Sequence, residues 1–124
     1  MRTRSKRTTP VRASGRATVL DRAHLARYTM ENRELEREII ALFLQQLPAT
    51  TAMLKTAATQ ADWKLAAHTL KGSAAAVGAT RINALAAELE KWAFDADHDP
   101  VENLLAALDR AIAQFRRAVG RIHG

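Results

Sequence analysis

The sequence predicts an all-α protein: an antiparallel four-helix bundle with a short N-terminal helix that caps one end. Three observations predict this class. The strong helix formers Ala, Leu, Glu, Arg and Lys dominate the composition, whereas 124 residues contain only three prolines and five glycines. Aromatic residues make up 5%, and no strand-like alternation is visible. Long segments with short connections repeat apolar residues at helical spacing, a pattern that buries its apolar faces most simply in a bundle.

The first two helical segments follow from N-caps and apolar spacing. Residues 21–28 are expected to form a short helix with Asp21 as its N-cap. A long segment runs from about Asn32 to Thr59, and Pro48 within it should kink the helix or split it in two. The apolar positions of this segment are Leu35, Ile39, Leu42, Phe43, Leu47, Met53, Leu54 and Ala57.

Two further helices are expected on either side of Gly78. The third spans residues 62–77, and Gly78 should end it as a left-handed cap. The fourth runs from Thr80, its expected N-cap, to about Phe94. The apolar stripe of the third helix is Trp63, Ala66, Ala67, Leu70, Ala74 and Val77. That of the fourth is Ile82, Leu85, Leu89 and Trp92, and both tryptophans are expected in the core.

The fifth helix follows a polar turn at residues 95–99 and has the strongest start signal. Asp99 is the expected N-cap, Pro100 the first helical residue, and Glu102 completes a box-like pattern. Gly120 is expected to stop the helix. Its stripe is Val101, Leu104, Leu105, Leu108, Ile112, Phe115 and Val119.

Charge divides the chain into a disordered basic tail, residues 1–19, and a folded domain, residues 20–122. The tail has no acidic residue and accounts for the whole net charge of +6. A nucleic-acid-binding domain should also be basic in its folded part, so nucleic acid is disfavoured as a partner, and the role of the tail stays open. The basic residues of the tail are Arg2, Arg4, Lys6, Arg7, Arg12 and Arg16.

Composition also limits the environment of the protein. The absence of cysteine excludes disulfides and thiolate metal sites and is compatible with the cytoplasm, which is the expected location. No apolar run approaches the ~18–20 residues of a membrane span, so no membrane association is expected. Every apolar stripe can be buried within one bundle, and we therefore expect a monomer.

The third helix carries a histidine on its outer face. His68 is ~200° around the helix from the core residue Leu70. Its neighbours on that face are Lys64, Lys71, Gly72 and Ala75. A glycine inside a helix costs ~1 kcal/mol relative to alanine, and close approach by another molecule would explain Gly72. The Lys71 ammonium could neutralise part of the charge of a phosphoryl group on His68.

The stretch from Ala67 to Ala79, AHTLKGSAAAVGA, resembles the signature of histidine-containing phosphotransfer (HPt) domains. That signature is roughly H-x-L-K-G-S/A with a further glycine six residues after the first, and the general pattern continues over residues 20–119. The resemblance implies a four-helix bundle without catalytic activity of its own. His68 would accept a phosphoryl group from a receiver-domain aspartate and pass it to another receiver.

The same resemblance implies the partners of the chain. They would be receiver domains of hybrid sensor histidine kinases and of response regulators. Mg²⁺ would belong to the receiver, so no cofactor or metal is expected in this chain.

A fourth site residue is carried over from the family. In several HPt domains a glutamine or glutamate 22 positions after the histidine hydrogen-bonds its ring, and Glu90 has that position here. The turn at Gly78 independently allows His68 and Glu90 to face each other. A carboxylate that accepts from Nδ1–H would leave Nε2 free as the nucleophile. The candidate site is therefore His68, Lys71, Gly72 and Glu90.

The remaining polar residues are assigned structural roles. Ser73 is expected to bond back to a backbone carbonyl. The other histidines, His24, His98 and His123, share no metal-ligand spacing and are expected on the surface.

Three alternatives to a phosphorelay carrier stay open. A non-transferring adaptor could bind a receiver or a kinase, although such proteins generally lack the histidine. The basic tail could drive association with nucleic acid. A hydrolase that uses His68 and Glu90 would lack a nucleophile, an oxyanion hole and a pocket.

Overall fold

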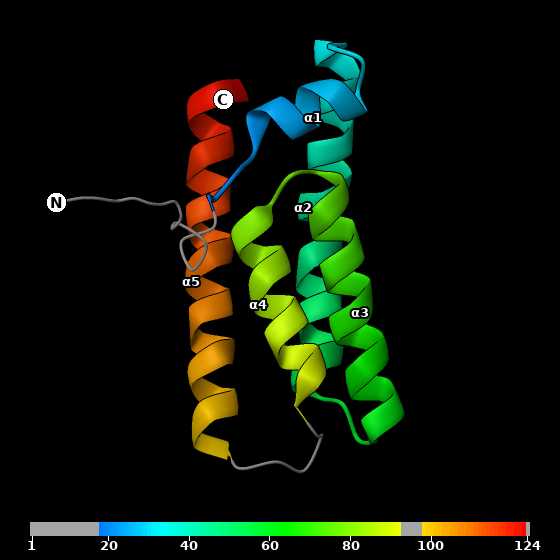
Figure 1. Cartoon of the computed structure of the whole chain (residues 1–124), viewed down its shortest axis with the longest axis vertical. Helices are drawn as coiled ribbons and strands as arrows, with labels where there is room; N and C mark the ends of the chain where they lie inside the picture. Colours follow the sequence, from blue (N-terminus) through cyan, green and yellow to red (C-terminus); the bar gives the residue numbers. More distant parts are fainter. Residues whose placement is uncertain (1–17, 93–97, 124) are drawn as a thin grey trace, which may run out of the picture.

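The computed structural model describes residues 18–92 and 98–123, and within this part it contains five helices and no strand. The helices are α1 (Arg22–Tyr28), α2 (Arg33–Lys55), α3 (Gln60–Ala76), α4 (Thr80–Lys91) and α5 (His98–His123). The long helices α2 to α5 run alternately in opposite directions, and α1 crosses one end of the bundle (Figure 1). The predicted all-α bundle is confirmed. The predicted tail up to residue 17 and the predicted turn residues 95–97 lie outside the described residues.

Side-chain caps fix where the first three helices begin. Asp21 accepts a hydrogen bond from the backbone N–H of His24, as predicted. Asn32 starts α2 in the same way, and Thr59 starts α3 through the N–H of Asp62. The second helix therefore ends at Lys55, four residues before the predicted Thr59, because Thr59 caps the next helix.

Pro48 was predicted either to kink the second helix or to split it in two, and the split is wrong. α2 continues through Pro48 as one helix of 23 residues. Leu47 and Leu54 are buried on either side of the proline. This packing on both sides can offset the local loss of a backbone hydrogen bond at proline.

Further predicted helix ends differ from the structure: α3 begins at Gln60 rather than at residue 62, and α4 ends at Lys91 rather than near Phe94. Thr80 is not the N-cap of α4: Ala79 has that position without a side-chain bond, and the Thr80 hydroxyl instead donates to the backbone oxygen of Thr18. α5 begins at His98, which places Asp99 in its first turn rather than at its N-cap. Gly120 does not stop α5, which continues to His123.

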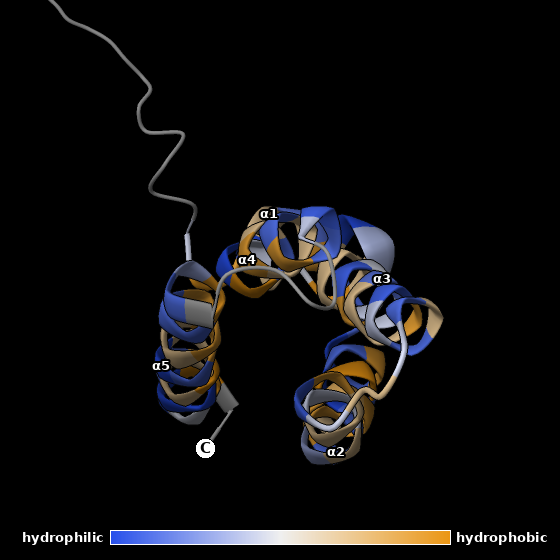
Figure 2. Cartoon of the chain, turned by 90° about the horizontal axis from the view of Figure 1, so that it is seen from below, coloured by the Kyte–Doolittle hydropathy of each residue, from blue (hydrophilic) through white to orange (hydrophobic). Residues whose placement is uncertain are grey.

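The core forms where the apolar faces of the long helices meet. Viewed along the bundle, α2, α3, α4 and α5 follow an arc with their apolar sides turned inward (Figure 2). Phe43 of α2 and Phe115 of α5 meet edge to face with ring centroids 5.3 Å apart, which joins the two ends of the arc. Some residues of the predicted stripes are not core: Leu35, Leu42 and Met53 are exposed, and Trp92 is half-buried.

The turn between α3 and α4 is the left-handed cap that the sequence predicts. Gly78 has φ +75°, and the N–H of Ala79 reaches back to the carbonyl of Ala74. The Gly78 carbonyl accepts a hydrogen bond of 2.7 Å from the N–H of Asp21. The turn is thereby tied to the segment that enters α1.

Gly78→Ala is expected to destabilise the protein by about 1–3 kcal/mol. A Cβ at this position would lie 2.7 Å from the backbone oxygen of Asp21, and the positive φ adds strain. Urea unfolding followed by circular dichroism measures the effect. Gly120→Ala is the control, because an added Cβ there meets nothing within 4 Å. Equal stability of Gly78→Ala and the wild type would contradict the turn geometry.

Candidate functional site

His68 projects from the exposed face of α3, as the helical wheel predicts. Its side chain is 67% exposed, whereas Ala67 and Leu70 on the inner face are buried. Lys64, one turn before it, is also exposed. The imidazole is thus held by a rigid helix and remains open to an approaching partner.

A single carboxylate on α4 bonds both His68 and Lys71. Glu90 Oε2 lies 3.1 Å from His68 Nδ1, and Glu90 Oε1 lies 2.7 Å from Lys71 Nζ. An ionised carboxylate only accepts hydrogen bonds, so Nδ1 must be the protonated ring nitrogen in this pair. The lone pair of the neutral imidazole is then on Nε2, the other ring nitrogen.

Two contacts between α3 and α4 fix the relative position of Glu90 and His68. Asn83 Nδ2 donates to the backbone oxygen of Lys71 at 2.8 Å. Trp63 Nε1 donates to the backbone oxygen of Leu89 at 2.9 Å, which satisfies the only polar atom of its buried side chain. Asn83 lies two helical turns before Glu90 and therefore on the same face of α4. Sequence reasoning missed Asn83, because nothing at the sequence level distinguishes it from a surface asparagine.

The charge of Glu90 is stabilised by its two partners. The hydrogen bond from the Lys71 ammonium, followed by that from His68, holds the pKa of Glu90 below its ordinary value, against an opposing effect of desolvation. Lys71 is therefore already paired in the unphosphorylated protein, a contact that the sequence did not predict. Glu90 itself lies where the resemblance expects it.

Glu90→Gln is expected to lower stability at neutral pH and to lose this effect in acid. A carboxyl with a lowered pKa contributes stability above its ordinary pKa, and this contribution disappears as the pH falls through the lowered value. Urea midpoints of the wild type and the variant should therefore differ at pH 7 and converge as the pH falls below the ordinary carboxyl range. Glu88→Gln is the matched control, since Glu88 forms an exposed ion pair with Lys91 at 3.4 Å. A difference that persists unchanged in acid would contradict the charge pairing.

Gly72 leaves an open surface one turn after His68. A Cβ added to it would meet nothing within 4 Å, so no contact within the described residues requires a glycine there. Ser73 next to it donates to the backbone oxygen of Thr69 at 2.6 Å, as predicted. Ala75, in the following turn, is exposed and small. The α3 surface that follows His68 toward Ala75 is thus low and carries small residues.

An exposed leucine beside His68 escaped the sequence reasoning. Leu65 is 58% exposed, and it lines a shallow groove with Met53 of α2 and Ala57 of the α2–α3 connection. The sequence contained a signal for this residue, because a helical wheel of α3 places Leu65 only ~60° from His68. Leu65 therefore provides an exposed apolar side chain about one helical turn before His68.

His24 differs from its prediction as a surface residue. Its ring stacks on Tyr28 with centroids 6.2 Å apart, and its Nε2 is buried without a hydrogen-bond partner among the described residues. The side chains of His98 and His123 lie outside what the structure describes. Trp63 is buried as predicted.

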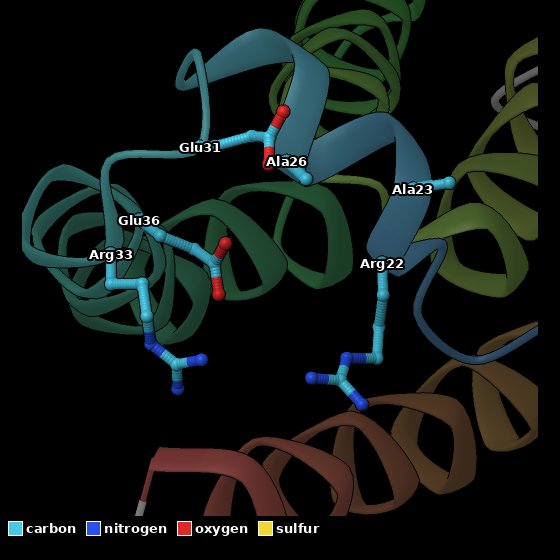
Figure 3. Close-up of a pocket in the computed structure, with 6 residues that line it drawn as sticks. All are labelled: Arg22, Ala23, Ala26, Glu31, Arg33 and Glu36. Carbon is cyan, nitrogen blue, oxygen red and sulfur yellow. The ribbon is translucent and has the colours of Figure 1, made fainter.

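A pocket at the α1 end of the bundle is separate from this site. Arg22 of α1 and Arg33 of α2 reach toward it from two sides, and Glu31 and Glu36 also line it (Figure 3). Two basic and two acidic side chains balance each other, and none of the four candidate site residues lines this pocket.

The comparisons with known proteins concern the region that contains this site. The family model described as "Hpt domain" matches residues 38–118, which is more than half of the chain. No curated protein and no solved structure gave a match. Within the described residues, no helix is both long and apolar enough to span a membrane.

Proposed function

Because the chain belongs to the Hpt domain family, whose members act in the phosphorelays of two-component signalling, we propose that His68 is its phosphoryl carrier. In this proposal His68 accepts the group from the aspartate of one receiver domain and passes it to another. The observation that carries the proposal is the pairing of His68 Nδ1 with Glu90 Oε2 at 3.1 Å on an otherwise exposed imidazole. This pairing leaves Nε2 as the available nucleophile.

The transfer needs no further reactant from this chain. The Nε2 lone pair attacks the phosphorus of the receiver's aspartyl phosphate, an N–P bond forms, and the P–O bond breaks to release the carboxylate. The ring keeps its proton on Nδ1 and becomes cationic, and the carboxylate of Glu90 stabilises that cation. The onward step reverses these events, with a neutral imidazole as the leaving group. We assign the Mg²⁺ of the reaction to the receiver.

Lys71 is proposed to balance the charge of the phosphorylated state. A phosphoryl group adds about 1.5–2 negative charges, and the Lys71 ammonium is held beside the imidazole through Glu90 at 2.7 Å. This single cation can interact with both anions. The chain thus supplies orientation, charge and access, and it acts as a carrier rather than as an enzyme.

The low surface around His68 is proposed to receive the partner. Gly72 and Ala75 allow close approach of a receiver's backbone, and Leu65 offers an exposed apolar contact. Buried apolar anchors beside a polar centre are typical of interfaces that bind reversibly.

Phosphotransfer from a charged receiver tests the proposal. A receiver domain is phosphorylated with acetyl phosphate and Mg²⁺, freed of the donor, and mixed with the full chain. The expected result is loss of phosphate from the receiver and gain of acid-labile, base-stable phosphate by the chain. If the chain binds the receiver but gains no phosphate, the adaptor alternative replaces this proposal.

A further inference from the structure

The exposed large hydrophobic residues are concentrated in one part of the chain. Within the described residues they all belong to residues 28–65, and none lies on α4 or α5. Three of them, Leu35, Leu42 and Met53, are on α2. The expectation of a monomer depends on burial of every apolar stripe within one bundle. α2 does not meet that condition, because the described residues leave part of its apolar surface uncovered.

These three residues belong to a second stripe of α2, which repeats at alternating spacings of four and three residues. At 100° per residue the six positions of this stripe fall within ~80° of one another, and they centre ~100° from the core residues Phe43 and Leu47. Five of the six are exposed, and Ile39 is half-buried. We call the stripe the α2 seam, and it consists of Leu35, Ile39, Leu42, Gln46, Ala49 and Met53.

The spacing of the α2 seam is that of the a and d positions of a coiled coil. Ile39 has an a position between Leu35 and Leu42 at d positions, a combination that favours two parallel strands. Gln46 has the next a position, where a single polar residue fixes the register of two helices. None of the seam residues is charged, which is typical of the centre of a protein interface. Elsewhere on α2 the exposed residues include Arg33, Glu34, Arg37, Glu38 and Lys55.

The helix that covers the α2 seam has to come from another molecule. Among the described residues, α3, α4 and α5 already bury their apolar faces in the core. α1 crosses the end of the bundle with Leu25 buried (Figure 1). Because the seam has the residues that favour pairing with an identical helix, its occupant is a second copy of this chain.

We infer that α2 pairs with α2 of a second copy, parallel and in register, to form a two-fold symmetric dimer. Each seam residue then faces its own counterpart across the axis, as in any two-fold interface of this kind. The two Gln46 amides can hydrogen-bond to each other. The seam is about 27 Å long at 1.5 Å per residue, which is fewer than three heptads. We therefore expect a weak dimer with a dissociation constant of about 10–100 μM.

The α2 seam continues toward the face that carries His68. Met53 at the end of the seam and Leu65 of α3 line the same shallow groove. A helix packed on the seam lies beside this groove and covers Leu65. Since Leu65 is also the proposed contact for a receiver, the dimer and the receiver would compete for it. This consequence rests on the proposed function, whereas the dimer itself does not.

Sedimentation equilibrium of the full chain, from about 1 μM to about 1 mM, tests the inference. The average mass is expected to rise with concentration toward twice the monomer mass. Leu42→Glu should raise the dissociation constant at least about tenfold, because it places an unpaired charge at the centre of the interface. Ala106→Glu adds the same charge to the exposed face of α5 and should leave the dissociation constant unchanged. Circular dichroism verifies that both variants are folded.

A cysteine cross-link tests the parallel register independently of stability. The chain contains no cysteine, so Gln46→Cys introduces a single thiol. In the inferred dimer two such thiols face each other, and mild oxidation should give a disulfide-linked dimer. Ala106→Cys is the matched control and should remain monomeric.

Three results would overturn the inference. The first is a wild type that stays monomeric at every concentration. The second is equal association of the wild type and Leu42→Glu, and the third is equal cross-linking of the two cysteine variants. A monomeric wild type whose receiver binding is weakened by Leu42→Glu would assign the α2 seam to the receiver instead.

Discussion

His68→Gln is expected to abolish phosphate uptake from a charged receiver domain. Glutamine keeps a polar side chain of similar reach, but its amide nitrogen has no lone pair available for attack on phosphorus. Because the His68 side chain is 67% exposed, the free energy of unfolding should change by no more than about 0.5 kcal/mol. Loss of uptake would then reflect lost chemistry rather than lost structure.

The measurement is the phosphate content of the chain after mixing with the charged receiver, read as a mass shift of the intact protein. Binding of the uncharged receiver is measured in parallel and should be retained, because the rest of the docking surface is unchanged. Phosphate on the His68→Gln variant would assign the carrier role to another residue. Phosphate on neither protein, with equal receiver affinity, would favour the adaptor alternative.

Gly72→Ala is expected to stabilise the isolated protein while slowing transfer. An added Cβ meets nothing within 4 Å, so the helix should gain about 0.5–1 kcal/mol from the better helix former. The same methyl group stands on the surface that the receiver is proposed to approach. Gly72→Gln, which extends further, should slow transfer more strongly and retain most of the gain in stability.

Urea unfolding and the dependence of transfer rate on receiver concentration separate the two effects. We expect the receiver concentration at half-maximal rate to increase, because the added side chain hinders docking and leaves His68 and Glu90 in place. Gly120→Ala is the matched control: an added Cβ there is also unobstructed, and it should leave transfer unchanged. Unaltered transfer by both Gly72 variants would leave the glycine without a docking role.

Apolar periodicity and local capping signals were sufficient for most of the fold. The cap at Asp21 and the left-handed turn at Gly78 depend on neighbours within a few residues, and both were predicted. The predicted split at Pro48 and the predicted N-cap at Thr80 failed because tertiary contacts decided them, whereas no contact among the described residues explains why α5 continues past Gly120. The hydroxyl of Thr80, for example, bonds to Thr18, which is distant in sequence.

The same distinction between local signals and tertiary contacts applies to the candidate site. The outward position of His68 follows from helix geometry alone. The position of Glu90 was expected from the family resemblance and, independently, from the turn at Gly78. The Lys71–Glu90 ion pair and the Asn83 contact depend on how two helices rotate against each other. Such rotation is set by packing of the whole interface, which no single residue pattern encodes.

The hydrogen bonds across α3 and α4 also bear on how the protein folds. His68 and Glu90 are 22 residues apart, and Trp63 and Leu89 are 26 apart, so one helical hairpin contains both pairs. Short loops lose little entropy on closure, and local contacts form early in folding. The Phe43–Phe115 contact, in contrast, joins α2 to α5 over a long stretch of chain. We therefore expect the geometry around the histidine to form with the α3–α4 hairpin, before the Phe43–Phe115 contact closes the bundle.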